Sequence, residues 1–259
     1  EGSLPIGGLS SSAAVIIVFL SALCRVNEIR LNEWELILMA KAAENEYVGV
    51  SCGKLDQSCE VLCRKDQLLY LDTKDDSYEL IPTSPNMKPY KIAVFFSGLE
   101  RSLKNSKYNA RVDECKAAAY ALKAFADLPY EMYADTRLRD VTSEVYEQYG
   151  ERLPENWRKR AEHYFTEYAR AEAGAAAWRR GDLDAYGKLI FESGYSSVHN
   201  YESGCPELIR LYEIMCQTDG IYGGRFSGAG FKGCCMALID PSYAEQIERQ
   251  VEDAYLKDF

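Results

Sequence analysis

The stretch Pro5-Ile6-Gly7-Gly8-Leu9-Ser10-Ser11-Ser12 stands directly before an unbroken apolar run, residues 13–20. Two glycines and three hydroxyls in this place can belong to a secretion signal, to a flexible linker or to a loop that holds an anion. The run follows Glu1 rather than a basic segment and is too short to span a bilayer, which excludes a signal peptide. It instead predicts a buried helix over residues 12–27 with the serines as its cap, which excludes a linker.

Composition restricts the class of protein. The chain has 259 residues, of which 47% are hydrophobic and 27% charged, the profile of one or two soluble globular domains. Forty acidic and thirty basic side chains give a formal net charge of −10, which removes the basic surface expected of a nucleic-acid-binding protein. An anionic ligand therefore needs local lysines or arginines that act against the overall charge.

The cysteines and histidines do not form a metal or disulfide pattern. Nine cysteines are scattered without a Cys-x-x-Cys pair, and the two histidines, His163 and His199, lie far apart. This spacing indicates neither a zinc finger nor a disulfide scaffold. We expect reduced, mostly buried thiols in a cytoplasmic protein that binds neither membranes nor nucleic acids, and a monomer as the default state.

Apolar periodicity and turn residues divide the chain into helices and strands. Prolines within residues 82–89 mark a boundary, so we predict an N-terminal domain over residues 1–88 and a C-terminal domain over residues 89–259. Helices are predicted over residues 12–27, 55–63, 110–126, 157–180, 183–198 and 207–216, with Asp182 as the cap of the fifth. Two more helices are predicted, one after the cap Asn32 and one that begins at Pro241. Strands are predicted over residues 68–71, 78–81, 92–96 and 235–239. Strands mixed with segregated helices predict an α+β fold.

Three short motifs can carry chemistry. Residues 7–12 precede a helix N-terminus, where backbone N–H groups and the helix dipole can bind an anion, although an ordinary multi-serine cap is the alternative. The glycine cluster at residues 223–233 leads into a strand and can serve a nucleotide or tight packing. Asp56 follows the turn Cys52-Gly53-Lys54-Leu55 and can act as a general base or cap a helix. Glu44, taken alone, is typical of a solvated carboxylate.

Together and in this order, the motifs resemble the signature set of the GHMP small-molecule kinases, in the galactokinase branch. They are Pro5-Ile6-Gly7-Gly8-Leu9-Ser10-Ser11-Ser12-Ala13, Cys52-Gly53-Lys54-Leu55-Asp56-Gln57 and Ser227-Gly228-Ala229-Gly230-Phe231-Lys232-Gly233. Between them, residues 106–115 resemble the stretch after the galactokinase domain boundary. The resemblance runs essentially from end to end, and residues 159–165 and 225–235 are more similar to plant galacturonokinases than to ordinary galactokinases.

The resemblance implies a two-domain α+β fold with the active site in the cleft between the domains. It implies an ATP-dependent sugar 1-kinase that phosphorylates the anomeric hydroxyl of D-galactose or D-galacturonate, with ATP and Mg²⁺ as cofactors. The residues that would wrap the phosphates are Gly7, Gly8, Leu9, Ser10, Ser11 and Ser12. Gly228 and Gly230 would shape the floor beneath nucleotide and substrate, and Ser12 and Glu44 would hold Mg²⁺.

The same resemblance implies the residues that act on the sugar. Asp56 would orient or deprotonate the anomeric hydroxyl that attacks the γ-phosphoryl group. Gly53 and Tyr108 would contact the sugar, and Arg101 would lie near the reacting groups. Most of the catalysis would then come from positioning and charge neutralisation.

Several positions depart from the family pattern. The first loop has one residue fewer between Pro5 and Leu9 than galactokinases usually carry, and Ala229 and Lys232 stand where glycines are common. Lys54 replaces a residue that is often apolar. Its ammonium can pair with the carboxylate of a uronic acid, which favours galacturonate, or it can lie exposed at the surface.

Two parts of the family pattern are not in this sequence. One is the N-terminal motif Arg-x-Asn-Leu-Ile-Gly-Glu-His-x-Asp, which binds sugar hydroxyls and supplies a catalytic arginine, and the other is the family's final strand. We therefore expect the 259 residues to be part of a longer protein and a poor catalyst by themselves.

Two other functions compete with the sugar kinase. A catalytically silent relative would bind ATP and sugar and signal through a partner protein, but such sensors can lose residues of the serine run or the aspartate, and here residues 10–12 and Asp56 are all present. A GHMP kinase for mevalonate or homoserine fits the serine loop but not the stretches at residues 52–57 and 108–111.

Overall fold

The computed structural model describes residues 9–49, 52–99 and 108–259. Its helices are α1 (Ser11–Val26), α2 (Glu33–Ala42), the π-helix η1 (Ala43–Val48), α3 (Leu55–Leu62), α4 (Tyr108–Phe125), α5 (Ser143–Tyr149), α6 (Glu155–Arg180), α7 (Leu183–His199), α8 (Pro206–Cys216) and α9 (Ala244–Tyr255). Its strands are β1 (Gln67–Leu71), β2 (Tyr78–Pro82), β3 (Lys91–Phe96), β4 (Ile221–Phe226) and β5 (Cys234–Ile239).

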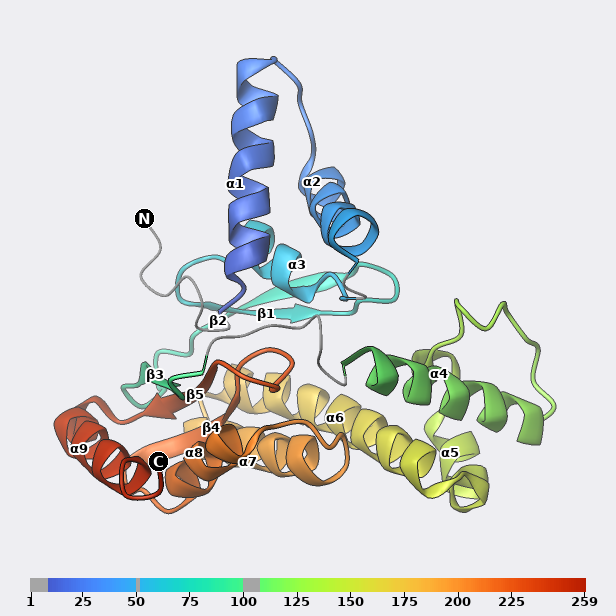
Figure 1. The fold of residues 1–259 in the computed structure, drawn as a ribbon. Coiled ribbons are helices and arrows are strands. Elements are labelled where there is room, and N and C mark those ends of the chain that lie inside the picture. The colour runs from blue at the N-terminus through green and yellow to red at the C-terminus, as the bar shows by residue number, and fades with distance from the viewer. Residues whose placement is uncertain (1–8, 50–51, 100–107) are drawn as a thin grey trace.

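The described elements form two parts (Figure 1). Helices α1, α2 and α3 and the antiparallel hairpin β1–β2 make the smaller part. The larger part holds an antiparallel sheet in the order β3-β5-β4, helices α6 to α9 around it, and α4 and α5 beside α6. The predicted α+β class is confirmed, while the division between residues 88 and 89, which falls between β2 and β3, stays a prediction.

Local signals set several helix starts as predicted. The Asn32 side chain accepts a hydrogen bond of 2.9 Å from the Glu35 N–H, and the Glu35 carboxylate accepts one of 2.7 Å from the Asn32 N–H, a complete capping box. Asp182 caps α7 by accepting from the Ala185 N–H at 3.1 Å. Its neighbour Gly181 ends α6 at φ 73°, a left-handed conformation that glycine adopts without strain.

Two hydrophobic cores stabilise the larger part. One joins α8 and α9 to one face of the sheet, and the other joins α4 and α6 to the segment before α5. The first contains Leu208, Leu211, Tyr212, Ile214, Met215, Phe226, Cys235, Ala237, Ile239, Ile247 and Val251. Burial of these side chains fixes the sheet against α8 and α9.

Helix α7 lies directly on the backbone of β4, because glycines face each other at the contact. A Cβ atom on Gly187 would lie 2.1 Å from the Tyr222 carbonyl oxygen, and one on Gly223 would lie 2.1 Å from the Gly187 carbonyl oxygen. The glycine pattern predicts a loop before a strand at Gly223 and its neighbours, and this prediction is wrong: residues 223–226 belong to β4. Glycine disfavours strands in general, but here close approach of the helix requires it.

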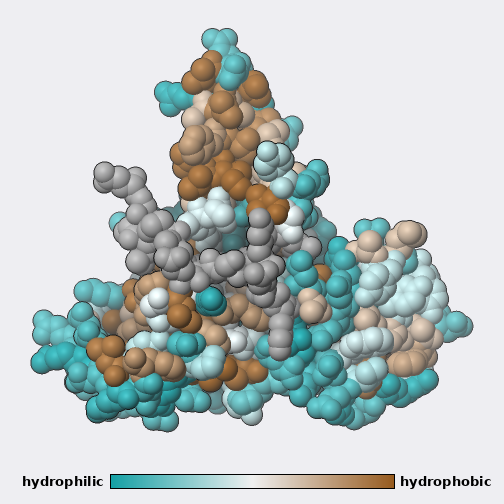
Figure 2. Space-filling model, viewed as in Figure 1, coloured by the Kyte–Doolittle hydropathy of each residue, from teal (hydrophilic) through white to brown (hydrophobic). Residues whose placement is uncertain are grey.

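Helix α1 is less covered than its sequence predicts. Ala13 and Ile17 are buried, whereas Val18 and Phe19 are each 66% exposed. The helix packs against α2 and α3 on one side, and Figure 2 shows apolar residues gathered on the face of this upper part. Because no other described element lies over that face, the expected burial of the whole helix is wrong for the described residues. Within residues 9–49, 52–99 and 108–259, no helix is long and apolar enough to cross a bilayer.

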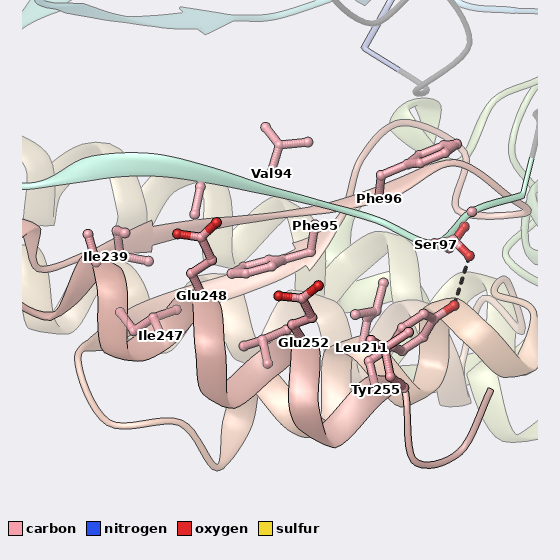
Figure 3. Close-up of a pocket in the computed structure, with 15 residues that line it drawn as sticks. Val94, Phe95, Phe96, Ser97, Leu211, Ile239, Ile247, Glu248, Glu252 and Tyr255 are labelled. Atoms are coloured by element: carbon pink, nitrogen blue, oxygen red, sulfur yellow. Dashed lines mark hydrogen bonds between the residues drawn. The ribbon is translucent and has the colours of Figure 1, made fainter.

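Strand β3 forms one edge of the sheet and borders a groove of about 610 Å³ against α9 (Figure 3). Phe95 points toward α9, while Val94 and Phe96 point to the opposite side. The Tyr255 hydroxyl donates a hydrogen bond of 2.8 Å to the Ser97 carbonyl and closes one end of the groove. Among the described strands only β5 pairs with β3, so its other edge keeps free backbone donors and acceptors.

The glycine contact between α7 and β4 predicts a large effect of one methyl group. Gly187→Ala places a Cβ atom against the Tyr222 backbone, which cannot rotate away, so we expect a loss of about 3 kcal/mol in the free energy of unfolding. Urea denaturation followed by circular dichroism measures it.

Gly174→Ala is the matched control. Its Cβ atom would meet only the Tyr186 ring, at 3.3 Å, in the middle of α6. There the change should stay within about 1 kcal/mol of the parent, because the ring can shift and alanine favours a helix. Equal effects of the two substitutions would contradict the direct backbone contact.

Candidate functional site

The site begins where α2 passes into the π-helix η1, which carries Glu44. Such π-helical turns are rare and often lie at functional sites. The Asn45 side-chain amide donates to the Cys52 carbonyl at 3.2 Å, and the Cys52 thiol donates to the Asn45 side-chain oxygen at 3.0 Å. These two hydrogen bonds fix the turn before α3 against η1, although Asn45 and Cys52 are seven residues apart.

A buried glutamine joins Glu44 to the helix that carries Asp56. The Gln57 amide donates a hydrogen bond to Glu44 Oε2, and Gln57 is fully buried in the first turn of α3. The Cys52 thiol lies 3.7 Å from the same oxygen, and burial followed by the Glu44 charge raises the pKa of Cys52 above its usual value. Sequence reasoning missed Gln57 as the link, because nothing in the motif shows which way its amide points.

Asp56 lies in the first turn of α3 and is half-buried. The N-cap of α3 is Lys54, and no side chain caps the helix, so the structure does not support the reading of Asp56 as a cap. Within the described part of the chain, the Asp56 carboxylate takes part in no hydrogen bond or ion pair. A half-buried carboxylate without a partner is a suitable general base.

Lys54 is neither exposed nor free. Its ammonium forms an ion pair with Asp76, lies 5.8 Å from the centre of the Trp34 ring, and leaves the side chain 13% exposed. Burial lowers its pKa, and the nearby Lys41 lowers it further. Lys54 is therefore not an exposed surface lysine, and its charge is already paired with Asp76 instead of being available to a sugar carboxylate. This ion pair joins the start of α3 to the β1–β2 turn.

The described part of the first motif lies at the start of α1, while Gly7 and Gly8 lie outside the described residues. Ser10 is the N-cap at φ 56°, and its carbonyl accepts from the Ala14 N–H at 3.1 Å, but its hydroxyl makes no capping hydrogen bond. Leu9 is half-buried and Ser12 is exposed. The capping role expected of the serines is therefore not seen at Ser10.

The third motif forms a loop between β4 and β5 that is fixed at both ends. The Ser227 N–H donates to the Cys234 carbonyl at 3.0 Å, and the Ser97 N–H and hydroxyl donate to the Gly233 carbonyl at 2.9 and 2.7 Å. Gly228 and Gly230 have φ of 59° and 71°, and a Cβ atom on Gly230 would lie 2.6 Å from Phe226. The loop therefore requires glycine at these positions.

A cavity of about 860 Å³ brings the second and third motifs together. Strand β1 and Leu55 line it on one side, and α6, α7, β4 and β5, with Ser227 and Gly228, line it on the other. Leu55 directly precedes Asp56, but Asp56 itself is not among the residues that line this space. Much of the lining is aromatic, and includes Tyr70, Tyr90, Trp178 and Tyr186.

A polar cluster forms part of the cavity wall and has no counterpart in the sequence predictions. Glu167 of α6 accepts hydrogen bonds from Arg170 at 2.7 Å, from Ser193 at 2.7 Å and from Arg225 at 3.2 Å. Burial alone would raise the pKa of Glu167, but the Arg225 charge and the Ser193 hydroxyl outweigh it and lower the pKa. Glu167 and Arg170 stand three residues apart on one helix face, which was the available sequence signal.

Two residues predicted for the site, Tyr108 and Arg101, differ in what the structure describes of them. Tyr108 is the first residue of α4 and is half-buried, but it does not line the cavity. Arg101 lies outside the described residues. The structure therefore brings Leu55 and Gly228 to one cavity and joins Glu44 to α3, the helix of Asp56, through Gln57. The assignments of Tyr108 and Arg101 stay predictions.

The residues implied for Mg²⁺ present suitable oxygen donors. Gln57 and Cys52 contact Glu44 Oε2, and Glu44 Oε1 accepts no hydrogen bond from the described residues. Mg²⁺ is usually held by one or two carboxylates together with substrate phosphates, so a larger acidic cluster is not needed. Within the described ranges no group of three His, Cys, Asp or Glu side chains could hold a metal. The Glu44 carboxylate and the Ser12 hydroxyl are therefore of the chemical type that binds Mg²⁺.

Comparison with known families gives two matches. Residues 1–64 match the family described as GHMP kinases N terminal domain, and residues 174–257 match GHMP kinases C terminal. They lie on either side of the predicted domain boundary.

Curated relatives are sugar kinases. The chain is 42% identical to a galacturonokinase of Arabidopsis thaliana over 99% of this chain and 60% of the relative. It is 36% identical to a galactokinase of a Roseiflexus species, over 96% of this chain and 61% of that protein. It is 33% identical to a galactokinase of Thermococcus kodakarensis, over 100% of this chain and 69% of that protein. The chain thus spans about three fifths of the length of the first two relatives.

Solved structures agree with the sequence relatives. The crystal structure of Lactococcus lactis galactokinase complexed with galactose matches with a TM-score of 0.88 at 27% identity, over 99% of this chain and 64% of that one. The crystal structure of L. major mevalonate kinase in complex with R-mevalonate matches with a TM-score of 0.55 at 16% identity, over 95% of this chain and 60% of that one, a likeness of fold alone.

His163 next to the polar cluster predicts a pH dependence of stability. Its Nδ1 lies 2.9 Å from the Ser196 hydroxyl, and burial lowers its pKa to about 4, although the Glu167 charge acts in the opposite sense. In the unfolded chain the pKa is about 6.5, so the unfolded state binds the proton first as the pH falls. The free energy of unfolding therefore decreases between about pH 7 and pH 4.

His163→Gln removes this contribution and keeps a hydrogen-bonding group near Ser196. Between pH 7.5 and pH 5 the parent should lose about 1–2 kcal/mol more than the variant. Urea unfolding at the two pH values measures the difference. Identical pH dependence in parent and variant would show that His163 is not held neutral.

Proposed function

Because the chain belongs to the GHMP kinase family, in its galactokinase branch, we propose that the whole protein is an ATP-dependent sugar 1-kinase. Its reaction is transfer of the γ-phosphoryl group of ATP to the anomeric hydroxyl of D-galactose or D-galacturonate. The curated relatives named for these two sugars support the choice of acceptor. We also propose a cytoplasmic monomer, in line with its free thiols.

One observation supports this proposal: the Asp56 carboxylate, which pairs with none of the described residues, directly precedes the Gln57 that holds Glu44. The two carboxylates therefore have different surroundings within one small region. Asp56 is open to accept a proton from a sugar hydroxyl, while Glu44 is fixed by the Gln57 amide and the Cys52 thiol. Separate environments for two acidic groups are what a division into base and metal ligand requires.

The remaining motif residues supply positioning. The N-terminal end of α1, with Ser10, Ser11 and Ser12, would place hydroxyls, backbone N–H groups and the helix dipole toward the phosphates. The left-handed glycines Gly228 and Gly230 would let the backbone approach the nucleotide and the sugar. Mg²⁺ bound by Ser12 and Glu44 would supply neutralisation of phosphate charge. Phosphoryl transfer depends mainly on such positioning and charge.

The choice between the two sugars is open to a direct test. Galacturonate differs from galactose by a carboxylate, and Lys54, the cation considered for it, is bound to Asp76. The higher identity to a galacturonokinase favours the uronate, and the ion pair removes the simplest way of recognising it. The proposal therefore covers both sugars.

A substrate panel tests the proposed function. The full-length protein is incubated with ATP, Mg²⁺ and galactose, galacturonate, glucuronate or arabinose, and ADP release is followed. We expect turnover with galactose or galacturonate and little with the other two. Binding of ATP without turnover on any sugar would contradict the kinase and favour a sensor that acts through a partner protein.

Asp56→Asn tests the proposed base. The substitution keeps the shape of the side chain and removes its charge, so we expect kcat to fall by at least about 100-fold with little change in the Kd of ATP. Calorimetric titration with a non-hydrolysable ATP analogue separates the two effects.

Asp253→Asn, an exposed position on α9, is the control and should retain parental turnover. Loss of nucleotide binding in the Asp56 variant, or retained turnover, would show that the role of Asp56 is assigned wrongly.

A further inference from the structure

An ionic cluster away from the motif residues joins α4, α6 and the segment after α7. At its centre is Arg160 of α6, a fully buried arginine. Arg160 Nε donates to Glu114 of α4 at 2.6 Å, and its Nη2 donates to Glu202 at 2.7 Å. Its Nη1 donates to the Asn200 carbonyl, so one guanidinium joins α6 to two other segments, α4 and the loop after α7.

Glu202 extends this cluster to the start of α4. It accepts a hydrogen bond from Arg111, in the first turn of α4, at 3.3 Å, and from Lys159 of α6 at 3.0 Å. Arg111 Nη1 also donates to both carboxylate oxygens of Glu114, at 2.9 and 3.1 Å. Glu202 therefore lies between two helices and is bound by cations from both.

The backbone at Glu202 indicates that the loop is held in place by these contacts. Its φ is 54°, a left-handed conformation that costs energy for a residue with a Cβ atom. Its hydrogen bond with Arg160 lowers the pKa of Glu202 to about 2, so the carboxylate stays ionised in the working pH range. Buried ion pairs add little net stability after desolvation, and a geometric role is their best attested use.

The residue before Glu202 packs against α6. Tyr201 is half-buried, and its ring centre lies 4.8 Å from that of His163. Burial raises the pKa of Tyr201, and the charges of Cys115 and Tyr108 raise it further. The contact of this loop with the first turn of α4 is made by Glu202, at Arg111.

We propose that Glu202 is a positioning residue that, with Arg160, clamps the first turn of α4 and thereby holds Tyr108 in place for the sugar. The inference rests on the proposed function, since Tyr108 is the residue expected to contact the sugar. Glu202 acts through Arg111 and α4 and not on the reacting atoms. Nothing in the three motifs requires this cluster, because its members come from residues 111–202.

Glu202→Gln removes the charge and keeps the size of the side chain. In the full-length protein we expect KM for the sugar to rise about tenfold, with KM for ATP unchanged and kcat within about twofold of the parent. Hydrogen exchange should also quicken at the amides of residues 112–115, which bond back to the first turn of α4.

Two further variants keep the test decisive. Glu155→Gln, an exposed partner of Lys159 outside the clamp, is the matched control and should change neither KM nor exchange in α4. Tyr108→Phe should raise KM for the sugar by itself. Because the clamp acts through Tyr108, the double variant Glu202→Gln/Tyr108→Phe should show no additional rise, which a double-mutant cycle measures.

The outcomes separate the clamp from the sugar kinase. Hydrogen exchange needs no turnover, so unchanged exchange in Glu202→Gln overturns the clamp even if the protein phosphorylates no sugar. Faster exchange with an unchanged KM for the sugar overturns the positioning role alone. Multiplicative effects in the double variant overturn the route through Tyr108. Absence of turnover in the parent overturns the proposed function, while faster exchange would still support the clamp.

Discussion

The hydrogen bond from the buried Gln57 amide to the Glu44 carboxylate is the contact on which the candidate site depends. It joins a π-helix to the first turn of α3, where Asp56 is the preceding residue. Without it, Glu44 would be a solvated side chain in η1. With it, the two carboxylates lie in neighbouring elements yet differ in their partners, and on this difference we base the proposed division into metal ligand and general base.

The sequence predicts most elements because their signals are local. The capping box at Asn32 and the Gly181–Asp182 pair mark helix ends within four residues. It misses the extent of β4, since Gly223 and Gly224 lack strand propensity and are explained only by the approach of α7. It overstates the burial of α1, because apolarity shows what a helix can bury and not what covers it. Tertiary contacts decide both cases.

In the candidate site, too, residues within short motifs are predictable from the sequence, and contacts between residues far apart in the sequence are not. The roles of the motif residues are predicted from the resemblance to the kinase family, and Leu55 of the second motif and Gly228 of the third do line one cavity. The Glu167–Arg225 and Arg160–Glu202 contacts could not, because their partners stand 58 and 42 residues apart. The partner of Lys54, 22 residues away, is equally invisible in the sequence, and it changes how the choice of sugar is argued.

The central claim is transfer of a phosphoryl group to the anomeric oxygen, and the position of the phosphate on the product tests it most directly. Phosphorus-decoupled proton NMR of the product made by the full-length protein identifies the carbon that carries the phosphate. The account predicts phosphorus coupling to the anomeric proton of galactose or galacturonate. Phosphate on another carbon, or release of inorganic phosphate with the sugar unchanged, would contradict it.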